Sequence, residues 1–155
     1  MSSTLHDFLI TATARATEGL IEAFLLLPED KRNWSPETTS RTAVDQIAEC
    51  ALLNKSTISL LQTRTMEQHE LPEFFAAKAE ACHLTWEELK ALLEENTRLF
   101  VEAIATVPAE DLAIEVTMPW GAMPISEILA YPYWNMTYHT GQITYLASMF
   151  KSLYA

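Results

Sequence analysis

The sequence has little glycine, little cysteine and no long apolar run. Three glycines disfavour a many-turned β-sandwich and any glycine-rich phosphate-binding loop. Two cysteines are too few for a disulfide framework or a cysteine zinc site, and free thiols suit a reducing compartment. No apolar run approaches the ~20 residues that span a bilayer, and the N-terminus lacks the charge pattern of a signal peptide. We therefore expect a cytoplasmic protein without a membrane span.

Basic residues are also scarce. The chain has 10 lysines and arginines against 21 aspartates and glutamates, a net charge of −11. The basic residues are scattered, so the chain should repel nucleic acid and anionic membranes, and we expect neither as a partner. Apolar residues make up 49% of the 155 residues and charged residues 20%, which is typical of a globular chain. The length predicts a single domain over residues 1–155.

Four segments carry apolar residues at every third or fourth position, the spacing of one helix face. Thr85 and Glu88 have the spacing of a helix-capping box, and Thr42 and Asp45 approximate one. The helical segments are 4–27, 42–66, 85–107 and 124–151. Four long helices joined in sequence predict an all-α fold, an up-and-down four-helix bundle.

Two connecting segments have weaker patterns. Pro72 interrupts the helical spacing over 67–84, so we expect at most a short helix over 74–82. In the segment 108–123, three apolar residues alternate with polar ones before a Pro-Trp-Gly turn. These are Ile114, Val116 and Met118. The pattern predicts a short hairpin before the last helix.

The last helix carries polar residues on its apolar face. Asn135 and His139 interrupt a stripe that otherwise faces the interior. Residues four apart can share one ligand or metal ion, and Pro132 beside them leaves the carbonyl of residue 128 without its helical partner. The alternative is a core pair satisfied by hydrogen bonds alone.

The other histidines and cysteines offer weaker candidates. His6 and His69 are expected on the surface. Glu80 and His83 have the Glu-x-x-His spacing of di-iron bundles, but a second such motif is missing. Cys50 follows an acidic residue, which raises the pKa of a thiol, so a reactive cysteine is not expected there.

The segment Ser126–Ile143 resembles the last-helix motif of the DinB/YfiT-like superfamily, most specifically at its His-x-Gly-Gln-Ile end. The Trp34-Ser-Pro36 loop and the Pro-Trp-Gly turn add to a resemblance that covers nearly the whole chain. The resemblance implies a four-helix bundle, often a homodimer, in which three histidines hold a divalent metal near one end.

Carried over position by position, the resemblance assigns the three ligand positions to Glu49, Asn135 and His139. Zinc and nickel prefer imidazole and tolerate carboxylate, whereas an asparagine amide is a poor ligand. The site therefore either binds zinc or nickel with altered preference, completed by water, or is a polar pocket without metal. We favour the second reading. Glu49 and His139 could then pair as a general base, as a polar-ligand site or as a structural hydrogen bond.

Three functions remain open. The first is a metal-dependent transferase or hydrolase acting on a thiol-linked small molecule, as the resemblance implies. The second is a metal-free small-molecule binder, and the third is a dimeric structural bundle. Whether the chain is an enzyme stays open. The expected pocket walls are Trp34, Tyr131, Tyr138 and Gln142.

Overall fold

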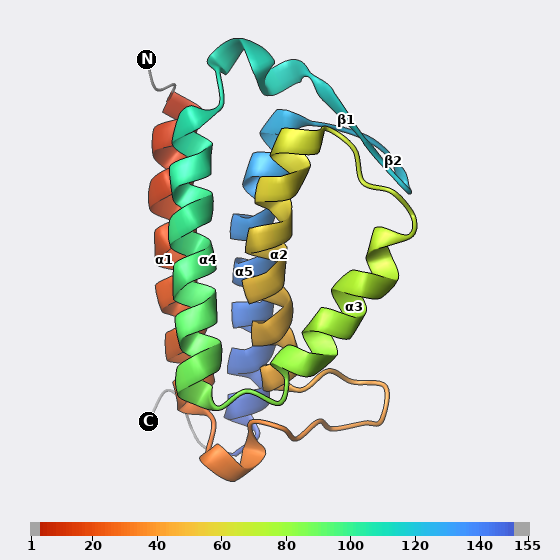
Figure 1. The fold of residues 1–155 in the computed structure, drawn as a ribbon. Helices are drawn as coiled ribbons and strands as arrows, with labels where there is room; N and C mark the ends of the chain where they lie inside the picture. Colours follow the sequence, from red (N-terminus) through yellow and green to blue (C-terminus); the bar gives the residue numbers. More distant parts are fainter. Residues whose placement is uncertain (1–3, 151–155) are drawn as a thin grey trace.

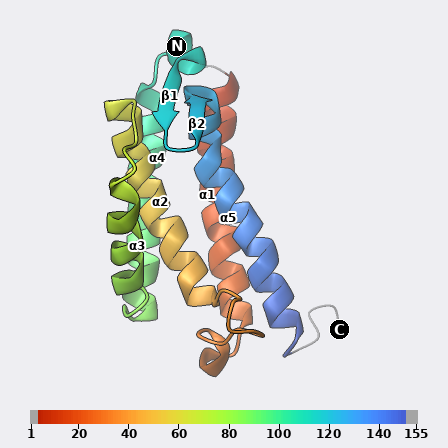
Figure 2. The same ribbon diagram turned by 90° about the vertical axis from the view of Figure 1, so that its right-hand side faces the viewer.

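A computed structural model describes residues 4–150 as an elongated helical bundle with one additional helix on its outside (Figure 1). Four long helices run along the bundle, and the shorter α3 leans against α2 (Figures 1 and 2). The expected all-α four-helix bundle is therefore confirmed. The helices are α1 (Thr4–Leu26), α2 (Ala43–Thr63), α3 (Glu70–Ala81), α4 (Trp86–Thr106) and α5 (Ile125–Ser148).

The capping residues predicted from sequence begin two of these helices. The hydroxyl of Thr42 accepts a hydrogen bond from the backbone N–H of Asp45 at the start of α2. At the start of α4, Thr85 and Glu88 form both halves of a capping box. The last helix was expected to begin with Pro124 and to run to about Lys151. In the structure Pro124 is the N-cap and α5 ends at Ser148, while Lys151 lies outside the described residues.

Helix α3 differs from the expectation. It begins at Glu70, earlier than the predicted start at residue 74, and Pro72 lies inside its first turn. The first backbone N–H groups of a helix have no acceptor within the helix, so a proline there removes no hydrogen bond. The prediction that Pro72 breaks this segment was wrong for that reason.

The predicted hairpin is present at the end of the bundle where α5 begins (Figure 2). Strands β1 (Glu115–Met118) and β2 (Gly121–Pro124) pair antiparallel. The backbone N–H of Met66 donates to the carbonyl of Thr117 at 2.8 Å, so the connection between α2 and α3 is bound to β1. This contact holds the hairpin turn beside the N-terminal end of α3.

Buried apolar side chains form two clusters, and in each of the four long helices a stretch of buried polar residues lies between them. Thr17, Asn54 and Thr97 belong to this polar layer: the hydroxyl of Thr97 contacts both Thr17 and Asn54, and the hydroxyl of Thr17 also donates to the sulfur of Met136. His6, expected on the surface, is also buried, and its Nε2 lies 2.9 Å from the carbonyl of Val107. The surface prediction for His6 was wrong, whereas His69 is exposed.

Candidate functional site

The candidate site lies where α5 crosses the first half of α2. Asn135 and His139 are both buried on the inward face of α5. Nε2 of His139 lies 3.2 Å from Oε1 of Glu49, which α2 supplies. Glu49 and His139, which the family resemblance assigned to one site, are 90 positions apart in sequence and contact one another in the structure.

Two glutamines complete the surroundings of His139. Its Nδ1 lies 2.9 Å from Oε1 of Gln46 and 2.8 Å from Oε1 of Gln142. Carboxylate and amide oxygens accept hydrogen bonds, so both ring nitrogens face acceptors. His139 thus has a hydrogen-bond acceptor at each ring nitrogen, with the carboxylate of Glu49 at Nε2.

The other oxygen of Glu49 faces two further cations. Nη2 of Arg41 lies 2.8 Å from Oε2 of Glu49, and Nζ of Lys78 lies 3.9 Å from the same oxygen. Asp45 binds both cations in turn, with Lys78 Nζ at 2.8 Å from its Oδ1. Burial alone would raise the pKa of Glu49, but hydrogen bonds from His139 and Arg41 outweigh burial and lower that pKa to about 2.

We define the polar cluster as Arg41, Asp45, Gln46, Glu49, Lys78, His139 and Gln142. Sequence reasoning missed four of its members. Gln46 stands three residues before Glu49 on α2, so helical spacing could have indicated it, whereas Arg41 precedes the N-cap of α2. Lys78 comes from α3, and no local pattern connects that helix to α2.

The residues at the three ligand positions do not fit a transition-metal site. Both oxygens of Glu49 already face N–H donors, and two of these donors belong to the positively charged side chains of Arg41 and Lys78. Nδ2 of Asn135 lies 3.5 Å from Sγ of Cys50, so its amide is directed to a thiol. Across residues 4–150 no group of three histidine, cysteine or acidic side chains could hold an ion. A divalent cation would also be repelled by Arg41 and Lys78.

Cys50 itself is buried beside the cluster. Burial, followed by the negative charge of Glu49, raises the pKa of its thiol. A thiol with a raised pKa is a weak nucleophile at neutral pH. The sequence expectation that Cys50 is unreactive agrees with this environment, although burial contributes more than the acidic neighbour.

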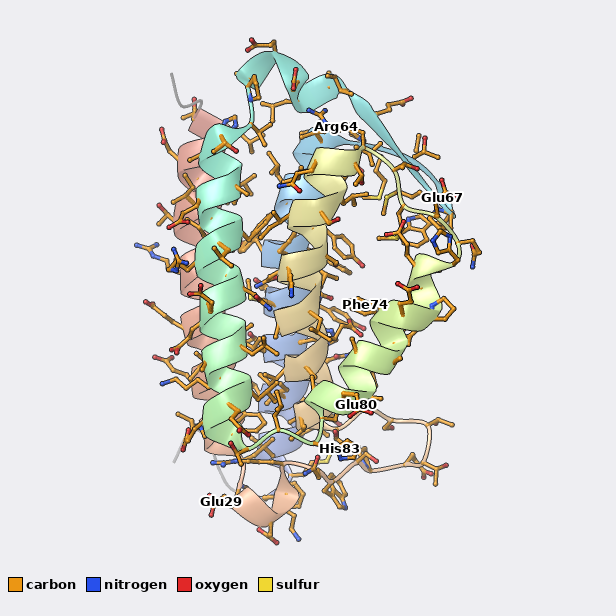
Figure 3. All side chains as sticks on the ribbon, viewed as in Figure 1. Glu29, Arg64, Glu67, Phe74, Glu80 and His83 are labelled. Carbon is orange, nitrogen blue, oxygen red and sulfur yellow. The ribbon has the colours of Figure 1, made fainter. Side chains whose placement is uncertain are left out.

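An apolar cavity of about 390 Å³ opens on the Glu49 side of the polar cluster. Residues of α2, α3, the hairpin and α5 surround it, and Glu49 lies in its wall. The lining residues are Glu49, Leu53, Ser56, Thr57, Leu60, Met66, Glu70, Leu71, Phe74, Phe75, Met118, Trp120 and Tyr131. Figure 3 shows Phe74 on the side of α3 that faces α2. We call this space the apolar cavity.

A second hollow, of about 360 Å³, lies on the other side of the polar cluster. The loop before α2, the first turn of α2 and the last turns of α5 line it, and Arg41, Gln46 and Gln142 are part of its wall. The cluster therefore separates an apolar space from a polar one.

The four predicted pocket residues lie in different places. Gln142 belongs to the polar cluster, and Tyr131 lines the apolar cavity. Trp34 packs edge-on against Phe150, with ring centres 4.9 Å apart, and is not part of the cavity wall. It attaches the loop before α2 to the end of α5.

Tyr138 is half exposed on the outer side of α5. Its ring stacks on Trp134 with centres 5.5 Å apart, and it meets His139 edge-on at 5.3 Å. Tyr131 contacts the other side of Trp134. These three aromatic residues form a continuous stack beside the site, and only Tyr131 reaches the apolar cavity.

Comparison with known protein families identifies the family of this chain. The model of the DinB superfamily matches residues 10–143, most of the chain. The chain belongs to the DinB superfamily. The DinB resemblance of the last helix is thereby confirmed, and the matched region contains all three predicted ligand positions.

Solved structures share this DinB fold. A mycothiol-dependent maleylpyruvate isomerase is similar with a TM-score of 0.72 and 16% identity over 92% of this chain. The chain spans only 63% of the length of that isomerase. An uncharacterised protein from Clostridium difficile 630 is similar with a TM-score of 0.70 and 14% identity over the full length of both chains.

A protein from Streptococcus pneumoniae is similar with a TM-score of 0.69 and 16% identity, covering 100% of this chain and 94% of its own. At these identities the likeness concerns the fold alone. No curated protein matches the chain. Among residues 4–150, no helix is long and apolar enough to cross a membrane.

Proposed function

We propose that this DinB protein binds a small organic molecule in the apolar cavity and does so without a transition metal. The observation that carries the proposal is the cavity itself, which ends at Glu49 of the polar cluster. Its volume of about 390 Å³ falls in the range of roughly 300–1,000 Å³ that is usual for small-molecule sites. Its wall is mostly apolar, with few polar groups to orient a ligand.

The polar cluster supports binding better than acid–base catalysis. A carboxyl group with a pKa of about 2 is ionised at neutral pH and is a weak base. His139 is 2% exposed and lies behind Glu49, so it does not reach the cavity wall. Glu49 can instead accept a hydrogen bond from a bound molecule or attract its positive charge.

The neutral fluorophore N-phenyl-1-naphthylamine tests the proposal, because its emission rises in an apolar site. We expect saturable binding to the unmodified protein. Leu53→Trp should fill the apolar cavity, and Phe75→Glu should place a charge at its edge, so each should weaken binding at least tenfold. Phe75 is 54% exposed, so its substitution tests the site even if Leu53→Trp disturbs folding. Leu25→Trp, at an exposed position of α1, is the matched control.

Unchanged fluorophore affinity in both cavity variants would overturn the proposal. So would the absence of saturable binding to the unmodified protein. Circular dichroism melting curves of each variant establish that a lost signal reflects the cavity rather than unfolding.

The second candidate is a metal-dependent transferase or hydrolase acting on a thiol-linked molecule. It is favoured by the likeness of the fold to a mycothiol-dependent maleylpyruvate isomerase. It requires zinc or nickel at Glu49, Asn135 and His139, which the cations around Glu49 oppose. Metal analysis of protein purified from cells supplied with both ions distinguishes the two candidates. A near-stoichiometric ion that disappears in His139→Ala would favour the enzyme.

Homodimerisation is compatible with either candidate. Trp134, Tyr138 and Tyr145 are exposed along α5, by 52%, 51% and 68%. A second copy packed on α5 would cover them, and aromatic residues are enriched in such interfaces. Light scattering should then give twice the chain mass of 17.5 kDa, and Trp134→Ala combined with Tyr138→Ala should yield monomer. A monomeric unmodified protein would contradict the dimer.

A further inference from the structure

The apolar cavity has aromatic walls on several sides. Phe74 and Phe75 come from α3, Trp120 from the turn between the strands, and Tyr131 from α5. These rings lie far apart in sequence, and the hairpin contact with the α2–α3 connection brings Trp120 to them. Burial and the charge of Glu49 raise the pKa of the Tyr131 hydroxyl, which places that ring within the field of Glu49. Aromatic rings attract cations to their faces, particularly alkylated ammonium groups.

The ionised groups of the cavity wall are all negative. Glu49 and Glu70 line it, whereas no lysine, arginine or histidine does so. The charge of Glu49 is balanced by Arg41 behind the wall. Glu70 differs, because no ion pair joins it to a basic residue within 4–150, although its Oε1 accepts the N–H of Glu67. The end of the cavity next to Glu70 therefore has an uncompensated negative charge.

One cation already lies against this wall. Nζ of Lys78 is 5.7 Å from the centre of the Phe75 ring, a cation–π geometry. Lys78 approaches from the side of Asp45 and is not part of the cavity wall. The net charge of −11 adds long-range attraction for positively charged molecules.

We infer that the apolar cavity recognises an organic cation, a molecule with an alkylated ammonium group and an apolar body. The ammonium group would lie between Trp120 and Glu70, and the body would extend along Phe75, Leu53 and Tyr131 toward Glu49. This inference rests on the proposed binding function and names its ligand class. An anion is disfavoured, because Glu70 would repel one.

Displacement of N-phenyl-1-naphthylamine by matched probes tests the charge preference. Choline and 3,3-dimethylbutan-1-ol have nearly the same shape, but only choline is charged. We expect choline to displace the fluorophore at a concentration at least tenfold lower, and benzyltrimethylammonium to act at lower concentration still. Benzenesulfonate should not displace it. Raising the salt concentration from 50 to 500 mM should weaken the binding of choline more than that of the alcohol.

Substitutions in the wall separate the aromatic from the ionic contribution. Trp120→Leu should weaken choline about tenfold while changing fluorophore affinity less than threefold, as expected for loss of a cation–π contact of ~1–2 kcal/mol. Glu70→Gln should weaken choline at least threefold and leave the alcohol unchanged. Glu73→Gln is the matched control, because Glu73 is in the same helical turn but does not line the cavity. Trp120 is 61% exposed, so its replacement should not unfold the chain.

The outcomes distinguish the inference from the proposed function. If the alcohol displaces the fluorophore as well as choline does, the cavity binds ligands but has no preference for cations, and the inference is wrong. Equal effects of Glu70→Gln and Glu73→Gln on choline would also overturn it. If the fluorophore does not bind at all, the proposed function is wrong, and the inference that rests on it is wrong as well.

Discussion

Nη2 of Arg41 lies 2.8 Å from Oε2 of Glu49, which places a permanent positive charge on the carboxylate at the first metal-ligand position of the family pattern. Lys78 and His139 add positive or proton-donating groups to the same carboxylate. A divalent ion at this position would have to displace Arg41 and leave its guanidinium without its partner. Arg41 and Glu49 are only partly exposed, so separating their charges would cost free energy. We therefore expect the Arg41–Glu49 contact to oppose metal binding in addition to the two missing histidines.

The effect of Arg41 on metal binding can be measured by restoring a histidine. Asn135→His would give the site two imidazoles and a carboxylate, a usable zinc set. We expect this single variant to bind zinc weakly because Arg41 still forms an ion pair with Glu49. Adding Arg41→Met removes the charge and should raise zinc affinity at least tenfold, measured by competition with a coloured chelator. Equal affinity of the single and double variants would show that Arg41 does not oppose the metal.

Acid should selectively weaken the contribution of Glu49 to stability. Its pKa is about 2 in the folded chain against an ordinary value of 4.5, so the folded state favours the ionised form. A lowered pKa stabilises the fold above the ordinary value, and the contribution disappears as the pH falls from about 4.5 toward 2. At about 1.4 kcal/mol for each pKa unit, the full shift corresponds to roughly 3 kcal/mol.

Glu49→Gln tests this pH dependence. At pH 7 the variant should unfold at lower urea concentration than the unmodified protein, by an amount that corresponds to roughly 3 kcal/mol. The difference should shrink between pH 4.5 and 2, because a protonated glutamate and a glutamine are both neutral. Exposed Glu94→Gln serves as the control. A difference that stayed constant down to pH 2 would contradict the low pKa of Glu49.

Loss of the Thr97 hydroxyl, at the centre of the polar layer between the two apolar clusters, should destabilise the fold. Oγ1 of Thr97 accepts from Nδ2 of Asn54 at 2.9 Å and lies 3.1 Å from Oγ1 of Thr17. Thr97→Val keeps the volume but leaves Asn54 without that acceptor. We expect a loss of about 1–3 kcal/mol in urea unfolding, the usual penalty of an unpaired buried polar group.

A double variant tests whether Asn54 and Thr97 act as a pair. Asn54→Leu combined with Thr97→Val removes both partners, so its loss should be smaller than the sum of the two single losses. Additive losses would mean that the hydrogen bond contributes nothing beyond the separate side chains.

The sequence predicted the elements whose signals are local. The capping box of Thr85 and Glu88 marked the start of α4, and the alternation at Val116 and Met118 marked the hairpin. It also brought Glu49 and His139 together, but through the family resemblance rather than through spacing. Periodicity alone identifies which face of a helix is buried and not which helix it meets.

The sequence did not reveal the residues that decide the chemistry of the site. Arg41 precedes the N-cap of α2, outside any periodic stripe, and Lys78 reaches Asp45 from α3. The apolar cavity depends on how α3 leans on α2, which is a tertiary relationship. His6 was misplaced for the same reason, because its burial comes from the segment that follows α4.

Helix α3 should be the least protected helix of the fold, and this is testable without a ligand. Ala81 is the one buried residue of α3, whereas α2 buries eleven along its length. Few buried contacts mean a low free energy of local opening. We therefore expect the amides of Phe74–Ala81 to exchange with deuterium faster than those of Ile47–Leu61, and faster than global unfolding would allow. Binding of N-phenyl-1-naphthylamine in the apolar cavity should slow exchange in α3 and leave α1 unchanged, because Phe74 and Phe75 would then contact the probe. Protection of α3 equal to that of α2 in the free protein would contradict a loosely attached cavity wall.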